Sequence, residues 1–533
     1  MALFSIQFFI FLALVIGLYY IVPGKLQKYV LLAANIIFYF IAGGLDAMAF
    51  ILITTVTTWF SAYKIESIEN AYKSRTANKE RPLSREEKAA LKEKARRRKK
   101  RYLVATLLIN FGILGVLKYG NFVIGNINAF LPETSRIADM GLLLPLGISF
   151  YTFQSTGYLI DVYRGSKNKA CRNLIDYAVF TTYFPQMIQG PINRFNELGH
   201  QLIEERRFDS ARFREGFSRL LWGYFKKMVI AERTAIIVNE VFNNYELHSH
   251  QGFIVFIGVF FYGVQIYADF SGGMDIVFGA SEIMGIDMQE NFRQPFMAKN
   301  VAEFWRRWHM TLGNWMRDYV FYPIALSKPF MKLGRSLKKK VGTYYGKVIP
   351  SFMASFIVFI LVGIWHGASW KYIAYGVYQA VFVSTATLFE KQYNAFNTFM
   401  KFDTESAGFK FWQMLRTTFI ITVGRYFSRA ATFTDAMRMY KATFTRFNPW
   451  VLFDGTLYTL GLEMKEFHFL ILMLIVLLAA DIIAEKGIVI RKEVAKQNTV
   501  FRWAVYLTAI LMIIIFGVYG PGFDAASFIY QKF

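Results

Sequence analysis

One stretch of the sequence reads Leu361-Val-Gly-Ile-Trp-His-Gly-Ala-Ser-Trp370, and it places an ionisable imidazole at the end of an apolar run long enough to cross a bilayer. An ionisable side chain at membrane depth costs free energy, so His366 is by default a functional residue. Its unperturbed pKa lies near neutrality, where a general base is effective. An interfacial histidine with one satisfied hydrogen bond explains this stretch equally well.

The composition is that of a polytopic membrane protein. Of 533 residues, 55% are hydrophobic and 18% are aromatic, which is too apolar for an ordinary soluble protein. The formal net charge of +24 is gathered between the hydrophobic stretches. This placement favours membrane topology and anionic lipid over nucleic acid, because no compact soluble domain is present to bind one. The single cysteine, Cys171, excludes a disulfide framework and a cysteine metal cluster.

Three apolar segments precede a strongly basic loop: residues 5–21, 29–42 and 48–63. Residues 64–101 hold 15 Lys or Arg and 6 Glu, so the positive-inside rule places this loop in the cytoplasm and the N-terminus outside. Ser84, followed three residues later by Glu87, predicts a helix start inside the loop. The first apolar segment is expected to be retained, since it has no basic n-region and no cleavage site.

Downstream of this loop the apolar pattern is interrupted. Pro, Gly and Arg occur within residues 183–194, which include Gln189, as is typical of a re-entrant segment. Irregular backbone at membrane depth survives only where protein or a water-filled cavity covers it, so an internal funnel is predicted. Asp269 and Asp275 predict a polar lining. Asp269 is interpreted as holding a buried partner such as an arginine, because no further carboxylate or histidine lies at metal-ligand spacing.

Residues 301–319, which follow Asn291-Phe-Arg293, are predicted to form one helix. At 100° per residue, four apolar residues share one face of it: Trp305, Trp308, Leu312 and Trp315. His309 lies at the border of this face, so the helix is amphipathic and belongs at or inside the membrane surface. The tryptophans are interpreted as packing or interfacial anchors rather than as an acyl groove.

Three arginines lie on or near this helix, at the cytoplasmic border: Arg306, Arg307 and Arg317. Guanidinium groups suit phosphates, so contact with coenzyme A or with the phosphopantetheine of an acyl carrier is one interpretation. Lipid headgroups fit the same residues equally well.

Five short motifs occur in order along the chain: Leu144-Pro-Leu-Gly-Ile-Ser-Phe150, Gln189-Gly-Pro191, Asp269-Phe-Ser-Gly272, Glu303-Phe-Trp-Arg-Arg-Trp-His309 and Trp365-His-Gly-Ala368. Together they resemble the membrane-bound O-acyltransferase family, over roughly residues 1–390. Within the family the chain looks most like the bacterial branch that contains alginate O-acetyltransferase and the membrane subunit of teichoic-acid D-alanyltransferase. Phe528-Ile-Tyr530 resembles the C-terminal tail of that branch, although the following Gln-Lys-Phe departs from it.

The resemblance implies an all-α polytopic membrane protein, a ring of about 10–12 transmembrane and re-entrant helices around a central funnel or tunnel. Four segments are expected: N-terminal spans over 1–63, the basic cytoplasmic loop over 64–101, the catalytic core over 102–390, and C-terminal helices with a short extracytoplasmic tail over 391–533.

The resemblance also implies two site histidines, His366 deep in the funnel and His309. Acyl transfer to a hydroxyl needs a base and a donor for the developing oxyanion, and His366 is assigned as the base. His309 is left with three roles: orienting the thioester, donating to the oxyanion, or a hydrogen bond within the fold. The cavity lining is predicted to include Trp305, Asp269, Gln189 and Asn291. No metal or permanently bound cofactor is expected, and acetyl-CoA or an acyl-carrier thioester is the expected donor.

The sequence therefore predicts an O-acyltransferase of the cytoplasmic membrane that moves an acetyl or other small acyl group from a cytoplasmic thioester toward a cell-envelope or extracellular polysaccharide. The branch resemblance adds a separate extracytoplasmic acetyltransferase, similar to SGNH hydrolases, as a partner. D-alanyl transfer from a carrier protein to teichoic acid is the alternative within the enzyme class. A transporter or lipid flippase, whose buried polar residues line a substrate path, is the alternative from another class.

Overall fold

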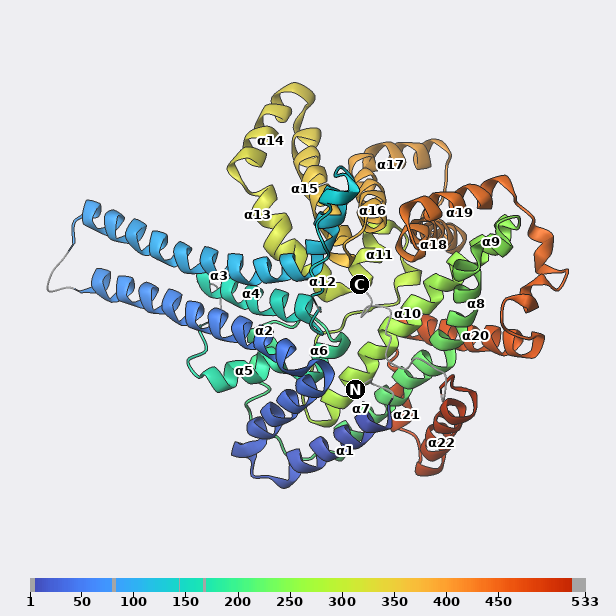
Figure 1. Cartoon of the computed structure of the whole chain (residues 1–533), viewed down its shortest axis with the longest axis horizontal. Helices are drawn as coiled ribbons and strands as arrows, with labels where there is room; N and C mark the ends of the chain where they lie inside the picture. The colour runs from blue at the N-terminus through green and yellow to red at the C-terminus, as the bar shows by residue number, and fades with distance from the viewer. Residues whose placement is uncertain (1–4, 79–82, 143, 166–168, 520–533) are drawn as a thin grey trace. The chain divides into compact units, whose positions relative to one another are not determined.

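The computed structural model describes residues 5–78, 83–142, 144–165 and 169–519, and these contain helices and loops but no β-strand (Figure 1). The chain forms two compact units. Unit 1 comprises Met1–Gly216 with Ala280–Gln289, and unit 2 comprises Phe217–Gly279 with Glu290–Phe533. The predicted division into four segments stays a prediction, and the tail motif at 528–530 lies outside the described residues.

Unit 1 is built around two long helices with shorter ones packed on them. Its helices are α1 (Ile6–Ile21), α2 (Gly24–Ala77), α3 (Arg85–Asn128), α4 (Ile148–Arg164), α5 (Leu174–Thr182), α6 (Phe184–Gln189) and the first part of α7 (Ser210–Tyr224). The interrupted sequence over 183–194 is a short helix followed by irregular chain.

The basic loop is a helical hairpin made by α2 and α3, which run side by side at the blue end of Figure 1. The predicted second and third apolar segments lie within α2, on either side of a break at Gly44, where φ is 67°. The two predicted segments are therefore separate helical stretches within α2, divided by the non-helical backbone of Gly44. The predicted helix start is confirmed, because Ser84 and Glu87 form a capping box. Lys99 of α3 pairs with Glu69 of α2 at 2.6 Å.

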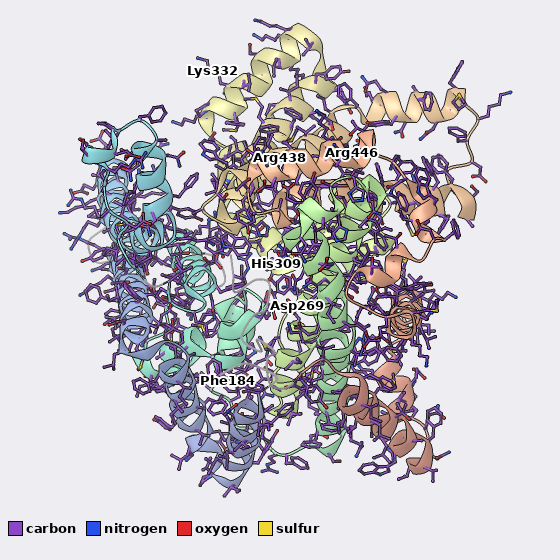
Figure 2. The ribbon with its side chains drawn as sticks, turned by 45° about the vertical axis from the view of Figure 1, so that its right-hand side comes forward. Phe184, Asp269, His309, Lys332, Arg438 and Arg446 are labelled. Atoms are coloured by element: carbon purple, nitrogen blue, oxygen red, sulfur yellow. The ribbon has the colours of Figure 1, made fainter. Side chains whose placement is uncertain are left out.

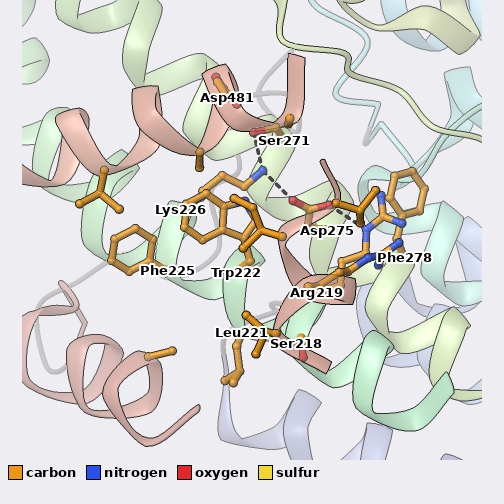
Figure 3. A pocket seen from close by; sticks show the side chains of 18 of the residues that line it. Ser218, Arg219, Leu221, Trp222, Phe225, Lys226, Ser271, Asp275, Phe278 and Asp481 are labelled. Carbon is orange, nitrogen blue, oxygen red and sulfur yellow. Dashed lines mark hydrogen bonds and ion pairs between the residues drawn. The ribbon is translucent and has the colours of Figure 1, made fainter. Parts of the chain in front are cut away.

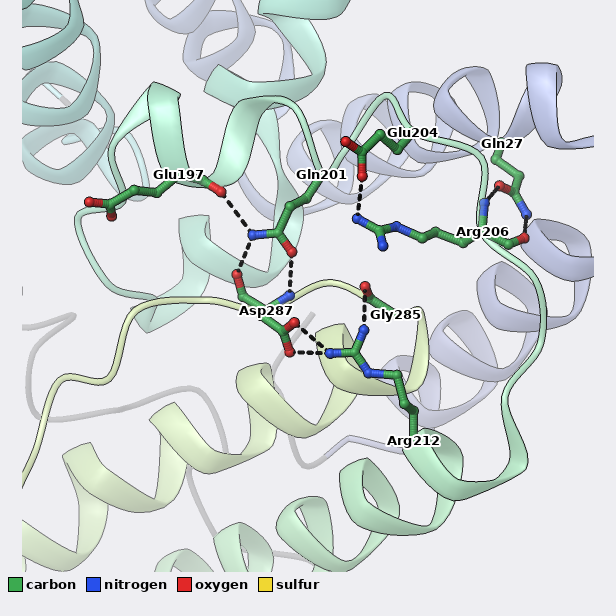
Figure 4. A network of polar contacts seen from close by, with 8 residues as sticks. All are labelled: Gln27, Glu197, Gln201, Glu204, Arg206, Arg212, Gly285 and Asp287. Carbon is green, nitrogen blue, oxygen red and sulfur yellow. Dashed lines mark hydrogen bonds and ion pairs between the residues drawn. The ribbon is translucent and has the colours of Figure 1, made fainter. Parts of the chain in front are cut away.

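Residues 280–289 belong to unit 1 through a network of polar contacts (Figure 4). Arg212 donates to the Asp287 carboxylate and to the carbonyl of Gly285. Gln201 donates to the Asp287 carbonyl at 3.0 Å and accepts from the Asp287 N–H at 2.9 Å. The side-chain amide of Gln201 thus bonds to the backbone of an extended segment as a neighbouring strand would.

Unit 2 holds the remaining helices. They are α8 (Glu232–Asn243), α9 (Tyr245–His248), α10 (Gly252–Ile283), α11 (Val301–Arg307), α12 (Met310–Met316), α13 (Tyr322–Ala325), α14 (Lys328–Val341), α15 (Thr343–His366), α16 (Trp370–Leu388), α17 (Glu390–Phe399), α18 (Ala407–Arg429), α19 (Phe433–Thr445), α20 (Met464–Glu485), α21 (Ile490–Ala495) and α22 (Thr499–Phe516). Helix α10 ends beyond the boundary, in unit 1. A π-helical turn, Phe225–Ala231, precedes α8.

Six helices of the described chain are long and apolar enough to cross a membrane: α2, α3, α10, α15, α20 and α22. A seventh span results if α16 and α17, which meet at a bend of 64°, are counted as one. The chain is therefore a multi-pass, all-α membrane protein, as the composition predicts. The ring around a funnel and the ten to twelve passes stay predictions.

Candidate active site

His309 lies at a sharp elbow between two short helices of unit 2. The predicted helix over 301–319 is not continuous, because α11 ends at Arg307 and α12 starts at Met310. His309 adopts left-handed backbone dihedrals, with φ 47° and ψ 51°. A residue with a β-carbon pays about 1–3 kcal/mol for a sparsely populated conformation of this kind, and it persists only where surrounding contacts hold it.

Asn291 supplies those contacts from a separate segment. Its carbonyl accepts the Met310 N–H at 3.0 Å, and its side-chain oxygen accepts the Thr311 N–H at 3.0 Å, so Asn291 caps the first turn of α12. The same side-chain oxygen lies 3.2 Å from Nδ1 of His309. Next to it, Phe292 forms an isolated antiparallel bridge with Trp308. Asn291 and Phe292 therefore contact the chain on both sides of His309, at Trp308 and at Met310 and Thr311.

The two candidate catalytic histidines contact one indole ring. The centroid of the Trp365 ring lies 5.7 Å from that of His309 and 5.0 Å from that of His366. Phe270 of α10 approaches His309 edge-on at 5.0 Å, and Figure 2 places His309 near Asp269 in the interior of the unit. His309 and His366 are 2% and 7% exposed, so both imidazoles are buried.

His366 is the last residue of α15, and its position depends on how closely α15 packs on α16. A Cβ on Gly363 would lie 2.8 Å from the Cα of Gly376, and a Cβ on Gly376 would lie 2.6 Å from the carbonyl oxygen of Phe359. Only glycine fits at both positions, so the two backbones nearly touch. At the end of α15, one turn after Gly363, the His366 ring packs against Tyr372 and Tyr375 of α16. The ring centroids are 6.5 and 5.8 Å away.

Burial lowers the pKa of His309 to about 3, with a smaller contribution from nearby His366. The charged form of a histidine is disfavoured in a dry environment and next to a second group that can become positive. His309 is therefore neutral throughout the physiological pH range.

The three arginines proposed for phosphate contact differ in their surroundings. The guanidinium of Arg307 already forms ion pairs within the protein, with Glu303 at 2.8 Å and with Glu485 at 2.7 Å. Arg317 pairs with its neighbour Asp318 at 3.0 Å. Arg306 is exposed and has no carboxylate partner among the residues that the structure describes. Of the three, Arg306 alone has a guanidinium that is free of ion pairs, so its role as a phosphate contact stays a prediction.

The predicted cavity-lining residues lie in different surroundings. Trp305 donates to Oε1 of Gln379 at 3.1 Å, and Asn291 is the fully buried cap described above. Gln189 belongs to unit 1, is 1% exposed, and has a side-chain amide with no hydrogen-bond partner within the described chain. Asp269 does hold a buried cation, as interpreted from the sequence, and Lys227 is one such partner.

A buried charge network was missed by the sequence reasoning. Lys227 contacts both Asp269 and Glu232, while the adjacent Lys226 pairs with Asp275 at 2.7 Å. The signal was present, since two lysines interrupt an apolar stretch and an ionisable residue within a membrane segment normally has a partner. The π-helical turn accounts for the geometry: both lysines lie within it and both are buried.

Two residues of this network, Lys226 and Asp275, line a cavity of about 1030 Å³ in unit 2 (Figure 3). Lys226 lies between the Ser271 hydroxyl, at 2.9 Å, and Asp275, and Arg219 lies 2.9 Å from the same Asp275 carboxylate. Apolar side chains of α20 and α22, such as Met473 and Met512, also line it. The cavity lining therefore combines charged and apolar side chains. Phe292, which also lines it, contacts Trp308 beside His309.

Comparison with known proteins adds to this geometry. Residues 171–338 match the model of the membrane-bound O-acyltransferase family; they include Asn291 and His309 but not His366. The chain is 31% identical over 456 residues to a Pseudomonas syringae pv. tomato protein named "Probable alginate O-acetylase AlgI", covering 84% of this chain and 76% of that protein. It is 29% identical over 370 residues to the peptidoglycan O-acetyltransferase of Helicobacter pylori, covering 64% of each. It is 31% identical over 252 residues to the teichoic acid D-alanyltransferase of Bacillus subtilis, covering 46% of this chain and 60% of that protein.

Proposed function

Because this chain belongs to the membrane-bound O-acyltransferase family, we propose that it takes an acetyl group from a cytoplasmic thioester and passes it through the membrane for O-acetylation of an extracytoplasmic polysaccharide. The observation that carries this proposal is that two buried histidines, His309 and His366, contact the same indole ring, that of Trp365. Similarity to probable alginate O-acetylases over 84% of the chain supports the acetyl group and the polysaccharide acceptor.

In the proposed reaction a hydroxyl oxygen attacks the thioester carbonyl. The C–O bond forms, the C–S bond breaks, and the hydroxyl proton passes to an imidazole and from there to the departing thiolate, so the imidazole is regenerated. His366 is assigned as this base, because a neutral imidazole at a buried site can take a proton from the attacking hydroxyl. The surrounding aromatic rings keep bulk water away, which limits hydrolysis of the thioester.

The donor and the partners belong to the proposal as well. Acetyl-CoA or an acyl-carrier thioester is the donor, and Arg306 is the cation proposed to meet its phosphate. The acceptor chemistry is completed by a separate extracytoplasmic acetyltransferase of the SGNH-hydrolase kind. In this proposal the thioester donor lies in the cytoplasm and the polysaccharide acceptor lies outside. Reacting groups in the interior of a membrane-spanning protein can be reached from both sides.

D-alanyl transfer to teichoic acid is a weaker second candidate, because that relative covers 46% of this chain, against 84% for the alginate O-acetylase. A transporter or flippase would move its substrate without consuming a thioester. Purified protein in proteoliposomes, given acetyl-CoA labelled in the acetyl group, separates the three candidates.

His366→Ala protein should insert and fold but fail to release free coenzyme A or to acetylate the envelope polymer. His468→Ala is the matched control, because His468 is exposed and contacts Tyr458 away from Trp365. Normal acetylation by folded His366→Ala protein would rule out the mechanism. Substrate movement without thioester cleavage in the native protein would rule out the enzyme class.

A further inference from the structure

The side-chain oxygen of Asn291 lies within hydrogen-bonding distance of three donors or acceptors. It is 3.0 Å from the Thr311 backbone nitrogen, 2.9 Å from the Thr311 hydroxyl and 3.2 Å from Nδ1 of His309. A backbone N–H only donates, so the atom that faces Thr311 must be the amide oxygen and not the amide nitrogen. The orientation of the Asn291 amide is therefore fixed by the backbone.

This orientation determines the proton on His309. An amide oxygen only accepts, so Nδ1 of His309 must carry the hydrogen that lies between the two atoms. In a neutral imidazole the other ring nitrogen, Nε2, then carries the lone pair. We propose that Asn291 is a positioning residue that holds His309 as the Nδ1–H tautomer and so makes Nε2 a hydrogen-bond acceptor.

The backbone contacts of the same segment hold the main chain on both sides of His309. The Arg293 N–H donates to the Arg307 carbonyl at 2.9 Å, and the Met310 N–H donates to the Asn291 carbonyl at 3.0 Å, on either side of the histidine. His309 is 2% exposed and Asn291 is fully buried. Bulk solvent therefore does not compete with the Asn291 oxygen for Nδ1, and this buried hydrogen bond favours the Nδ1–H tautomer.

The inference rests on the proposed function for its catalytic meaning, and it separates the roles that the sequence leaves open for His309. A neutral imidazole with Nδ1–H cannot donate from Nε2, so His309 does not supply the hydrogen bond to the oxyanion from that atom. Nε2 instead accepts a hydrogen bond from a hydroxyl or thiol of the reactants. The proton donor for the oxyanion is then a different group.

The tautomer can be measured without any acyl transfer, so its failure is distinct from failure of the proposed function. The chain has six histidines, and nitrogen-15 NMR of histidine-labelled protein in lipid distinguishes protonated from unprotonated ring nitrogens. The His309 signals are those that disappear in His309→Gln protein. We expect a protonated Nδ1 and an unprotonated Nε2 in the native protein. The opposite pattern would overturn the proposal.

Variants of Asn291 test the cause of the tautomer. Asn291→Leu removes the acceptor at similar volume and should give a mixture of tautomers; an unchanged spectrum contradicts the proposal. Asn291→Asp keeps an acceptor and should preserve the protonated Nδ1. Thr311→Val is the matched control, because it removes only the hydroxyl that shares the oxygen and leaves the backbone N–H in place.

Kinetics of the same variants separate positioning from folding. We expect Asn291→Leu to lower kcat about 10- to 100-fold with KM within about twofold, and Asn291→Asp to restore most of the loss. Thr311→Val should stay within about threefold of the native kcat. If Asn291→Leu is inactive only because it does not fold, Asn291→Asp still decides: a folded Asp variant without protonated Nδ1 overturns the proposal.

Discussion

The imidazole of His366 stacks on the ring of Tyr372 at an interplanar angle of 28°, with 6.5 Å between the ring centroids. Together with the contacts of Trp365 and Tyr375, this packing restricts the orientation of the proposed base. We expect Tyr372→Ala to lower kcat about 10- to 100-fold, because a catalytic ring that is free to turn loses its alignment. Tyr372→Phe keeps the stacking surface and should retain most of the activity. Steady-state kinetics on both variants check this, and equal losses would assign the effect to the phenolic hydroxyl instead.

The glycine pair between α15 and α16 should be essential for the position of His366. Gly363→Ala places a methyl group 2.5 Å from the Tyr372 carbonyl oxygen, so the helices must separate. Overpacking of this kind costs about 1–3 kcal/mol, and the shift is transmitted to His366 one turn away. We expect lower thermal stability and an acetylation rate reduced at least 10-fold.

Gly112→Ala is the control for this substitution, because a Cβ at Gly112 meets no atom within 4 Å. It should leave the melting temperature unchanged or slightly raised, as expected for alanine in a helix. Equal effects of the two substitutions would contradict the importance of the close packing.

The ion pair of Lys227 with Asp269 should matter far more than an exposed pair. Asp269→Asn removes one carboxylate from a buried ammonium that also contacts Glu232, and breaking a buried pair costs about 3–5 kcal/mol. Arg97→Gln breaks an exposed pair with Glu93 and should cost less than about 1 kcal/mol. Yield and melting temperature in detergent measure both. A stable Asp269→Asn protein with low acetylation activity would instead assign Asp269 to the reaction.

The sequence was sufficient for the class of fold, because apolar runs are local patterns, whereas the catalytic roles of its two histidines stay predictions. It was not sufficient for the elbow at His309. The periodicity of residues 301–319 is that of one helix, and the break arises from contacts with Asn291, a residue ten positions before that segment. Lys227 was missed for a similar reason, since its partner Asp269 is 42 residues away. Tertiary contacts of this kind override local pattern.

The lowered pKa of His309 should make the protein less stable in mild acid. The unfolded chain takes up a proton at this histidine near pH 6.5, whereas the folded chain does so only near pH 3. Stability is therefore fully present above pH 6.5 and is lost as the pH falls, by roughly 2 kcal/mol at pH 5. Melting temperatures between pH 7.5 and pH 5 should fall for the native protein and for His468→Ala, and should fall less for His309→Gln. An equal fall in all three would assign the pH dependence to other groups.

The α2–α3 hairpin should be accessible to protease from the cytoplasmic side only. Helix α3 has 44 residues, about 66 Å at 1.5 Å per residue, which is about twice the thickness of the hydrocarbon core. Its apolar part begins after Arg101, so the preceding turns extend beyond the membrane, and the excess of basic residues places them in the cytoplasm. Trypsin should therefore cut within residues 64–101 in inside-out vesicles and leave this segment intact in right-side-out spheroplasts. Cleavage only in the spheroplasts would reverse the orientation, and with it the assignment of donor and acceptor to the two sides of the membrane.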